Sequence, residues 1–155
     1  MEIRIEAASD LHLEECADIL QYSRLGEEYF PDREDAVSLL TEGIEKEEIY
    51  VALDEDGTCL GFIYYILKGA FDAFPYLKLI AVRKDRRSMG VGSNLLQFFE
   101  DAVFPESSRV FLVVADFNGD AQRLYERLGY RQIGEIPGLY RDWITEHLMV
   151  KEREA

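Results

Sequence analysis

One segment of the chain passes from strand to turn to helix: Leu79-Ile80-Ala81-Val82-Arg83-Lys84-Asp85-Arg86-Arg87-Ser88-Met89-Gly90-Val91-Gly92-Ser93-Asn94-Leu95-Leu96. Its first four residues are apolar and predict a buried strand. Leu95, Phe99, Ala102 and Val103 follow the i, i+4, i+7, i+8 spacing of an amphipathic helix. The turn between them would point free backbone N–H groups at one spot, where the helix dipole favours phosphate.

The charges of this turn differ from those of the whole chain. The protein has 17 Lys+Arg against 31 Asp+Glu, yet four cations (Arg83, Lys84, Arg86 and Arg87) fall within five residues here. Cations at a helix N-terminus oppose the preference of the dipole for acidic residues, and a bound anion would account for them. The alternative is a solvated loop whose cations pair with nearby carboxylates.

Two phosphate loops with known spacing do not fit. A Walker loop needs a Lys after its last glycine, and none follows Gly90 or Gly92. A dinucleotide fingerprint needs a third glycine where Leu95 stands. The turn reads R-x-x-G-x-G from Arg87 to Gly92, which resembles the coenzyme A pyrophosphate loop of the GCN5-related N-acetyltransferase (GNAT) family.

The periodicity of the remaining chain predicts the order β-α-α-β-β-β-α-β-α-β-β. Strands are expected at residues 2–7, 48–53, 58–66, 76–82, 109–115, 130–136 and 145–151, and helices at 9–22, 32–44, 93–104 and 119–128. Residues 26–31 are expected to break the pattern, and 69–75 to form an aromatic loop. The β-α-β segment at 76–115 forces two parallel neighbours by a right-handed crossover. We therefore expect a single α/β domain, residues 1–155, with a mixed, mostly antiparallel sheet and helices on both faces.

Composition narrows the classes of partner. The net charge of −14 argues against nucleic acid but allows a cationic small molecule or a basic peptide, or serves solubility alone. No run of about 18 apolar residues is present, so no membrane span is expected. Cys16 and Cys59 lie within an expected helix and strand as small core residues, and only two His occur. These features predict a cytoplasmic protein without a metal.

A second local match follows the first by one strand. Asn118 to Tyr130 resembles the N-x-x-A-x-x-L-Y-E-x-x-G-F/Y segment of the same family, and the sequence is identified as a member of it. The resemblance implies acetyl-CoA as co-substrate, its pantetheine arm lying between two splayed strands, 79–82 and 110–115. The residues implied in binding it are Ile80, Ala81, Val82, Arg87, Ser88, Met89, Gly90, Val91, Gly92, Ser93 and Asn118.

The same resemblance implies residue roles. Tyr125 matches the acid that protonates the leaving thiolate, since a phenol with a pKa near 10 keeps its proton at neutral pH. Its position on the apolar helix face also allows a purely core role. Asn118 would bond the pantetheine or adenosine portion, cap the helix, or do both. A backbone N–H of the splayed strand would polarise the acetyl carbonyl.

The general base is where the sequence departs from the family. Many relatives carry a Glu on the strand before the turn, whereas this chain has Tyr76-Leu77-Lys78-Leu79 there. A water chain remains open as the route for the amine proton. The candidate residues are Asp72, Tyr76, Asp116 and Glu28. An aromatic substrate wall is expected from residues 29–30, 71–76 and 139–143, which are equally suited to plug the core.

The resulting expectation is an acetyl-CoA-dependent N-acetyltransferase acting on a primary amine, in a small molecule or a peptide, by direct attack in a ternary complex. The absent strand carboxylate keeps open an alternative, a non-catalytic acyl-CoA sensor of the same fold. A protein that binds adenine nucleotides is disfavoured because neither phosphate loop is present. Dimerisation is common in the family, so a homodimer is allowed.

Overall fold

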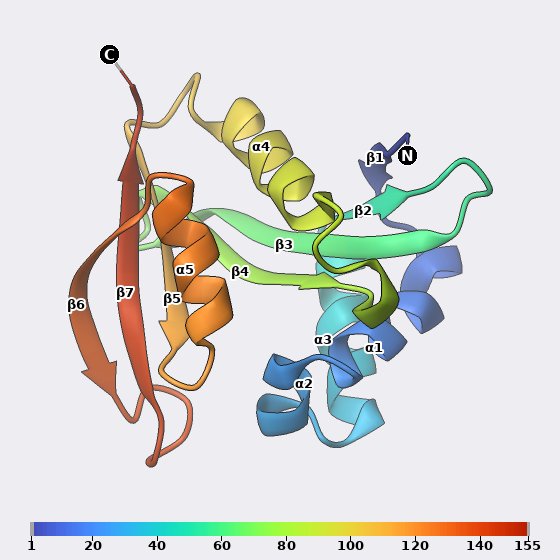
Figure 1. The fold of residues 1–155 in the computed structure, drawn as a ribbon, viewed down its shortest axis with the longest axis horizontal. Coiled ribbons are helices and arrows are strands. Elements are labelled where there is room, and N and C mark those ends of the chain that lie inside the picture. The colour runs from blue at the N-terminus through green and yellow to red at the C-terminus, as the bar shows by residue number, and fades with distance from the viewer. Residues whose placement is uncertain (1, 155) are drawn as a thin grey trace. The chain divides into compact units, whose positions relative to one another are not determined.

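The computed structural model describes residues 2–154, and Figure 1 labels its main elements. The strands are β1 (Arg4–Ala7), β2 (Ile49–Leu53), β3 (Cys59–Ala70), β4 (Phe74–Val82), β5 (Arg109–Ala115), β6 (Arg131–Pro137) and β7 (Thr145–Glu152). The α-helices are α1 (Leu13–Gln21), α2 (Arg24–Tyr29), α3 (Arg33–Glu45), α4 (Val91–Val103) and α5 (Gly119–Arg127). Short 3₁₀ helices form η1 (Asp10–His12) and η2 (Lys84–Arg86).

The strands form one seven-stranded sheet in the order β1-β2-β3-β4-β5-β7-β6. The pairs β1–β2, β2–β3, β5–β7 and β6–β7 are antiparallel, and β4–β5 is parallel. The parallel pair is joined through α4, because parallel neighbours need a crossover connection. The predicted α/β class with a mixed, mostly antiparallel sheet is confirmed.

The chain divides into two compact units. Unit 1 consists of the residues up to Tyr65 together with Leu79–Ala102, and unit 2 of Ile66–Lys78 together with everything from Val103 onward. The turn at residues 87–92 therefore belongs to unit 1. The segment from Asn118 to Tyr130 belongs to unit 2. Each unit carries one of the two motifs on which the family resemblance rests.

Unit 1 has its core between helices and strands that bury complementary apolar faces. Leu20 of α1, Leu40 of α3 and Phe62 of β3 are fully buried, and α1 packs on α3. A Cβ on Gly61 would stand 2.6 Å from the carbonyl oxygen of Ala81, so only glycine lets β3 approach β4 this closely. The Arg83 N–H donates to Leu60 O at 2.8 Å. These contacts fix the end of β4, from which the basic turn starts.

Unit 2 is built on the apolar strand β5, which pairs with β7 along its whole length. Helix α5 runs beside β5 in Figure 1. Ala70, Phe111 and Val150 form a buried cluster, and Tyr76 and Leu148 pack against it. The continuous apolar run at 109–115 predicted a central strand, and the structure confirms its bounds.

Two local predictions were wrong. Residues 26–31 do not simply break the pattern, because Arg24–Tyr29 form α2, with the Ser23 hydroxyl accepting from the Gly26 N–H at 3.0 Å. The loop predicted at 69–75 is shorter, because β3 extends to Ala70 and β4 begins at Phe74. Phe71 and Asp72, both with a φ of 57°, make the tight turn between these strands.

The composition raised three questions, which concern the two cysteines, a membrane span and a metal site. Cys16 and Cys59 are free thiols and are fully buried. Within residues 2–154, no helix has the length and apolar character needed to cross a membrane. No group of three His, Cys, Asp or Glu side chains suited to a metal ion occurs in that same range.

Candidate functional site

Residues 87–92, hereafter the anion loop, follow η2 and include the first two residues of α4. Ser88 has a φ of 65° and Gly90 a φ of 84°, so the backbone takes the left-handed conformation at two nearby residues. Such alternation turns successive N–H groups toward one point and makes an anion-binding concavity. The residues Arg87 to Gly90 are all exposed. The anion loop therefore offers main-chain donors to solvent.

The start of α4 adds to this concavity. The Asn94 N–H and its side-chain amide both donate to Gly90 O, at 3.0 and 2.9 Å. Among the described residues, Asn94 is the first of α4 whose N–H has a backbone acceptor. The N–H groups of Val91, Gly92 and Ser93 precede that bond, and the first turn carries no acidic side chain. The dipole and the free N–H groups together suit a phosphate.

The four cations of the basic turn have different surroundings. Arg83 pairs with Asp85 at 3.0 Å, and Arg86 lies 4.0 Å from Asp54. Arg83 is thus held by a carboxylate, whereas the Nε of Arg86 is buried and has no hydrogen-bond partner among the described residues. Within the part of the chain that the structure describes, Lys84 and Arg87 have no ion pair. They are the cations left to meet an anion.

The backbone of Ile80, Ala81 and Val82 belongs to unit 1. Ala81 is buried, whereas the flanking Ile80 and Val82 are half-buried, as expected for a strand whose faces alternate. The parallel ladder between β4 and β5 consists, for the described residues, of Tyr76 opposite Phe111 and Leu77 opposite Leu112. Both pairs lie within unit 2.

Tyr125 lies on α5 in unit 2 and is buried, with 6% of its surface exposed. Its ring centroid is 5.8 Å from that of Tyr130. Burial raises the pKa of the Tyr125 hydroxyl above its ordinary value, so the phenol keeps its proton at neutral pH. Asn118 caps α5, its side-chain oxygen accepting from the Ala121 N–H at 3.4 Å. The capping alternative for Asn118 is thus confirmed.

Tyr76, Tyr125, Tyr140 and Glu146 form a second polar group in unit 2, hereafter the tyrosine cluster. The hydroxyls of Tyr76 and Tyr140 are 3.1 Å apart. The pKa of Tyr76 is raised, first by burial and then by Tyr140, Glu146 and Tyr125. Glu146 itself is 2% exposed. Sequence reasoning missed Glu146; the available signal was a carboxylate just before the apolar run from Leu148 to Val150.

The predicted base candidates differ in their surroundings. Asp116 is exposed, and its carboxylate accepts from the Thr145 N–H at 3.1 Å. Asp72 is exposed in the tight turn before β4, and Glu28 is exposed on α2. Tyr76 alone is joined to another polar side chain of the tyrosine cluster. Of the aromatic residues predicted for a substrate wall, Phe71, Tyr140 and Trp143 are exposed and so are not core plugs.

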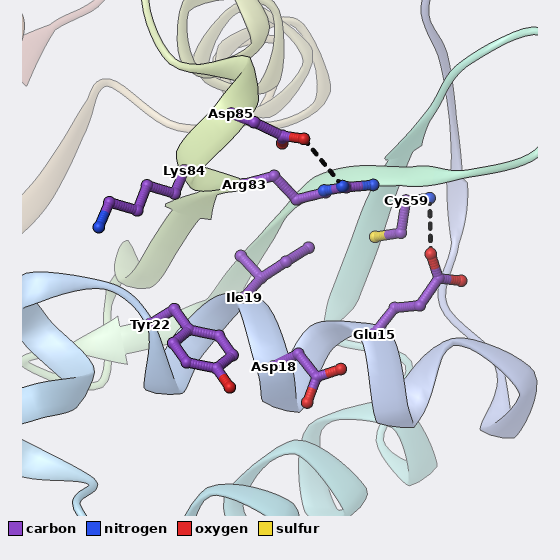
Figure 2. A pocket seen from close by; sticks show the side chains of 8 residues that line it. All are labelled: Glu15, Asp18, Ile19, Tyr22, Cys59, Arg83, Lys84 and Asp85. Carbon is purple, nitrogen blue, oxygen red and sulfur yellow. Dashed lines mark hydrogen bonds and ion pairs between the residues drawn. The ribbon is translucent and has the colours of Figure 1, made fainter.

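A pocket of about 580 Å³ lies within unit 1, where two cations of the basic turn, Arg83 and Lys84, form part of its lining. Figure 2 shows α1 on one side of it and the residues that follow β4 on the other. Its lining residues are Glu15, Asp18, Ile19, Tyr22, Cys59, Arg83, Lys84 and Asp85. Most of its charges are engaged: Glu15 accepts from the Cys59 N–H at 3.0 Å, and Asp18 pairs with Arg33 at 2.7 Å. The lining includes no residue of the anion loop.

Comparison with known proteins finds relatives in sequence and in structure. An uncharacterized N-acetyltransferase of Methanocaldococcus jannaschii is 33% identical over 107 residues, which are 67% of this chain and 65% of that relative. The chain thus spans just under two thirds of that relative's length. The crystal structure of Ard1 from Thermoplasma volcanium matches over 100% of both chains, with 24% identity and a TM-score of 0.83.

A chain of the NatC complex, crystallised with Gag peptide and CoA, matches over 99% of this chain and 100% of its own, with 16% identity and a TM-score of 0.77. These structural likenesses show the fold. The Acetyltransferase (GNAT) family profile matches residues 13–130, and this span includes both motifs. The chain therefore belongs to the acetyltransferase (GNAT) family.

Proposed function

We propose that this protein is an acetyl-CoA-dependent N-acetyltransferase that transfers the acetyl group to a primary amine, in a small molecule or a peptide. The observation that carries the proposal is the anion loop. N–H groups on exposed residues, left-handed Ser88 and Gly90, and Arg87, which has no ion pair among the described residues, suit a diphosphate, which coenzyme A contains. Membership of the GNAT family, whose proteins use acetyl-CoA, supports the same co-substrate.

In this proposal the binding residues have distinct tasks. The main-chain N–H groups of Arg87, Ser88, Met89, Gly90, Val91, Gly92 and Ser93 hold the diphosphate. The backbone of Ile80, Ala81 and Val82 bonds the pantetheine arm and polarises the thioester carbonyl. Asn118, whose oxygen already caps α5, contacts the same arm with its amide. We assign the proposed activity to a single domain, residues 1–155.

The chemistry is direct attack in a ternary complex. The nitrogen of a neutral amine bonds to the acetyl carbon, and the bond from that carbon to sulfur breaks. Tyr125 gives its proton to the departing thiolate, which a buried phenol with a raised pKa can do at neutral pH. The amine loses a proton to a base. The acidic protein, with its net charge of −14, attracts amines that are cationic in solution.

The test is an acetylation assay with acetyl-CoA and a panel of alkylamines, arylamines, polyamines and peptides with free N-termini. Release of the CoA thiol, measured with a thiol reagent, is expected for at least one amine. Calorimetry with CoA runs in parallel. Binding of CoA without turnover on any amine would favour the acyl-CoA sensor instead, and absence of binding would reject both functions.

We assign the reaction to the reducing cytoplasm, where buried free thiols such as Cys16 persist.

A further inference from the structure

The pocket of unit 1 has two walls. Glu15, Asp18, Ile19 and Tyr22 follow the i, i+3, i+4, i+7 spacing of one helical face, along α1 and its C-cap. The facing wall consists of residues 83–85 of the basic turn, together with the first residue of β3. The volume of about 580 Å³ lies in the range of small-molecule sites. No residue of the anion loop lines the pocket, so a ligand there would leave that loop open.

Three of the five charged side chains in this lining are already paired within the protein. Arg33, from α3, holds Asp18 at 2.7 Å. Arg83 and Asp85 hold each other at 3.0 Å, as the dashed line between them in Figure 2 shows. The other two charged side chains therefore determine which ligand the pocket would attract.

The first of these is Glu15, a half-buried carboxylate on α1. Its Oε2 accepts from the Cys59 N–H at 3.0 Å, and this bond holds the carboxylate against the start of β3. Among the described residues, Glu15 has no ion pair and its Oε1 has no hydrogen bond. A carboxylate partly removed from water is stabilised by a cationic donor. Glu15 thus offers one fixed acceptor to an ammonium group.

The second is Lys84, which carries the opposite charge on the opposite wall. It is exposed on η2, and it has no ion pair in the part of the chain that the structure describes. Figure 2 shows Glu15 toward one end of the pocket and Lys84 toward the other, with Ile19 and Tyr22 between them. The pocket therefore has a negative end, a positive end and apolar surface between the two.

We propose that this pocket binds an extended zwitterion, namely a short peptide with free termini and apolar side chains. The terminal ammonium donates to Glu15 Oε1, the terminal carboxylate accepts from Lys84 Nζ, and the side chains pack on Ile19 and the ring of Tyr22. A polyamine would meet Lys84 as a like charge, and a simple anion would meet Glu15 as one. An α-amino acid holds its two charges too close together to reach both ends.

The test is calorimetry at about pH 7 with trileucine, whose three extended residues span roughly 10 Å. N-acetyl-trileucine lacks the ammonium, and we expect it to bind about tenfold more weakly, because a hydrogen bond to a half-buried charge is lost. Trileucine amide lacks the carboxylate, and we expect a loss of up to about fivefold, because Lys84 is exposed. Free leucine, a short zwitterion, should bind most weakly of the four.

Two variants place the peptide in the pocket. Glu15→Gln keeps an oxygen for the Cys59 N–H but removes the charge, so trileucine and N-acetyl-trileucine should bind with nearly equal affinity. Lys84→Gln should likewise abolish the preference for trileucine over its amide. The matched controls are Glu45→Gln and Lys46→Gln, because both residues are exposed at the end of α3 and neither lines the pocket. Both controls should keep the preferences of the parent protein.

The exposed position of Lys84 keeps the test usable if Glu15→Gln fails to fold. Absence of trileucine binding to the parent, equal affinity for free and blocked peptides, or parent preferences in the folded variants would overturn the inference. Displacement of trileucine by saturating CoA would also overturn it, because the peptide would then occupy the CoA site. None of these results depends on acetyl transfer, so a failure here would leave the proposed function untouched.

Discussion

The anion loop of unit 1 and the tyrosine cluster of unit 2 keep their polar groups in opposite environments. In the anion loop the groups are main-chain N–H donors, those of Arg87 to Gly90 on exposed residues, and left-handed Ser88 and Gly90 orient them. In the tyrosine cluster the groups are side chains, and Glu146 and Tyr125 are buried to 2% and 6% exposure. One region offers fixed dipoles to solvent, and the other, apart from exposed Tyr140, keeps its titratable groups away from solvent.

The difference has a physical consequence. Exposed N–H groups in a fixed concavity attract an anion without changing their own protonation state, so changes there should alter affinity. Buried hydroxyls and carboxylates have their pKa set by the loss of water and by one another, so changes there should alter rate and its pH dependence. The two regions should therefore give separable phenotypes.

The largest effect is expected at Tyr125 in unit 2. Tyr125→Phe removes the proposed proton donor while keeping the ring, so kcat should fall about 100-fold or more with little change in CoA affinity. Steady-state kinetics and calorimetry measure the two quantities. Tyr130→Phe is the matched control, because Tyr130 is also buried and its ring lies 5.8 Å from that of Tyr125. If both variants keep the parent kcat, Tyr125 has only a core role.

Tyr64, which lies outside both regions, tests whether burial raises the pKa of a tyrosine in this protein. Tyr64 of β3 is 1% exposed, and burial, followed by the charges of Glu48 and Glu42, raises its pKa to about 12. The unfolded chain releases this proton near pH 10, so the contribution to stability is complete below pH 10 and is lost as pH rises toward 12. That loss amounts to about 3 kcal/mol for two pKa units.

Chemical unfolding of the parent and of Tyr64→Phe between about pH 8 and about pH 11 measures this effect. The free energy of unfolding should decline less steeply in the variant, which has no hydroxyl to ionise. Parallel declines in the two proteins would mean that Tyr64 titrates normally. The argument from burial would then be weakened for the tyrosine cluster too.

Much of the fold could be predicted because its signals are local. The apolar run 109–115 defines β5, and Asp54 to Gly57 define the turn between β2 and β3. Helix α2 could not be predicted in this way. Its sequence contains Gly26, which is required because a Cβ there would stand 1.8 Å from Leu20 O, a contact between two helices. The extension of β3 to Ala70 likewise depends on pairing with β4 and not on its own residues.

The same distinction between local signals and contacts of distant residues applies to the candidate site. The anion loop has a sequence signature in its glycines and its cations, but the left-handed φ of Ser88 is not part of that signature. Which cations are paired depends on partners such as Asp54, 32 residues before Arg86, and no local pattern reveals it. Glu146 was missed because a carboxylate in a strand is expected to face solvent, and only the register with Ala115 and Ile136 shows it buried.

An effect of intermediate size on CoA binding is expected at Gly90. Gly90→Ala puts a Cβ on a residue with φ of 84°, where the nearest neighbour is Asn94 Nδ2 at 3.8 Å. The strain of about 1–2 kcal/mol and the obstructed N–H groups should weaken CoA binding about tenfold. Gly57→Ala is the matched control, with φ of 81° and nothing within 4 Å. Calorimetry and thermal unfolding should show similar destabilisation in both variants but weaker binding only in the first.

The smallest effect on CoA affinity is expected at the cations of the basic turn, residues 83–87. Arg87 has no ion pair among the described residues, whereas Arg83 is held by Asp85 at 3.0 Å. An exposed charge contributes about 0.2–1 kcal/mol, so Arg87→Ala should weaken CoA binding up to about fivefold at low salt. Because the Debye length falls to about 3 Å at 1 M, this difference should vanish in concentrated salt. Arg83→Ala should change affinity less, since its charge is already neutralised. If Arg83→Ala has the larger effect and the effect survives salt, the anion is bound by side chains near the end of β4, and the backbone concavity at Gly90 is not its main binding site.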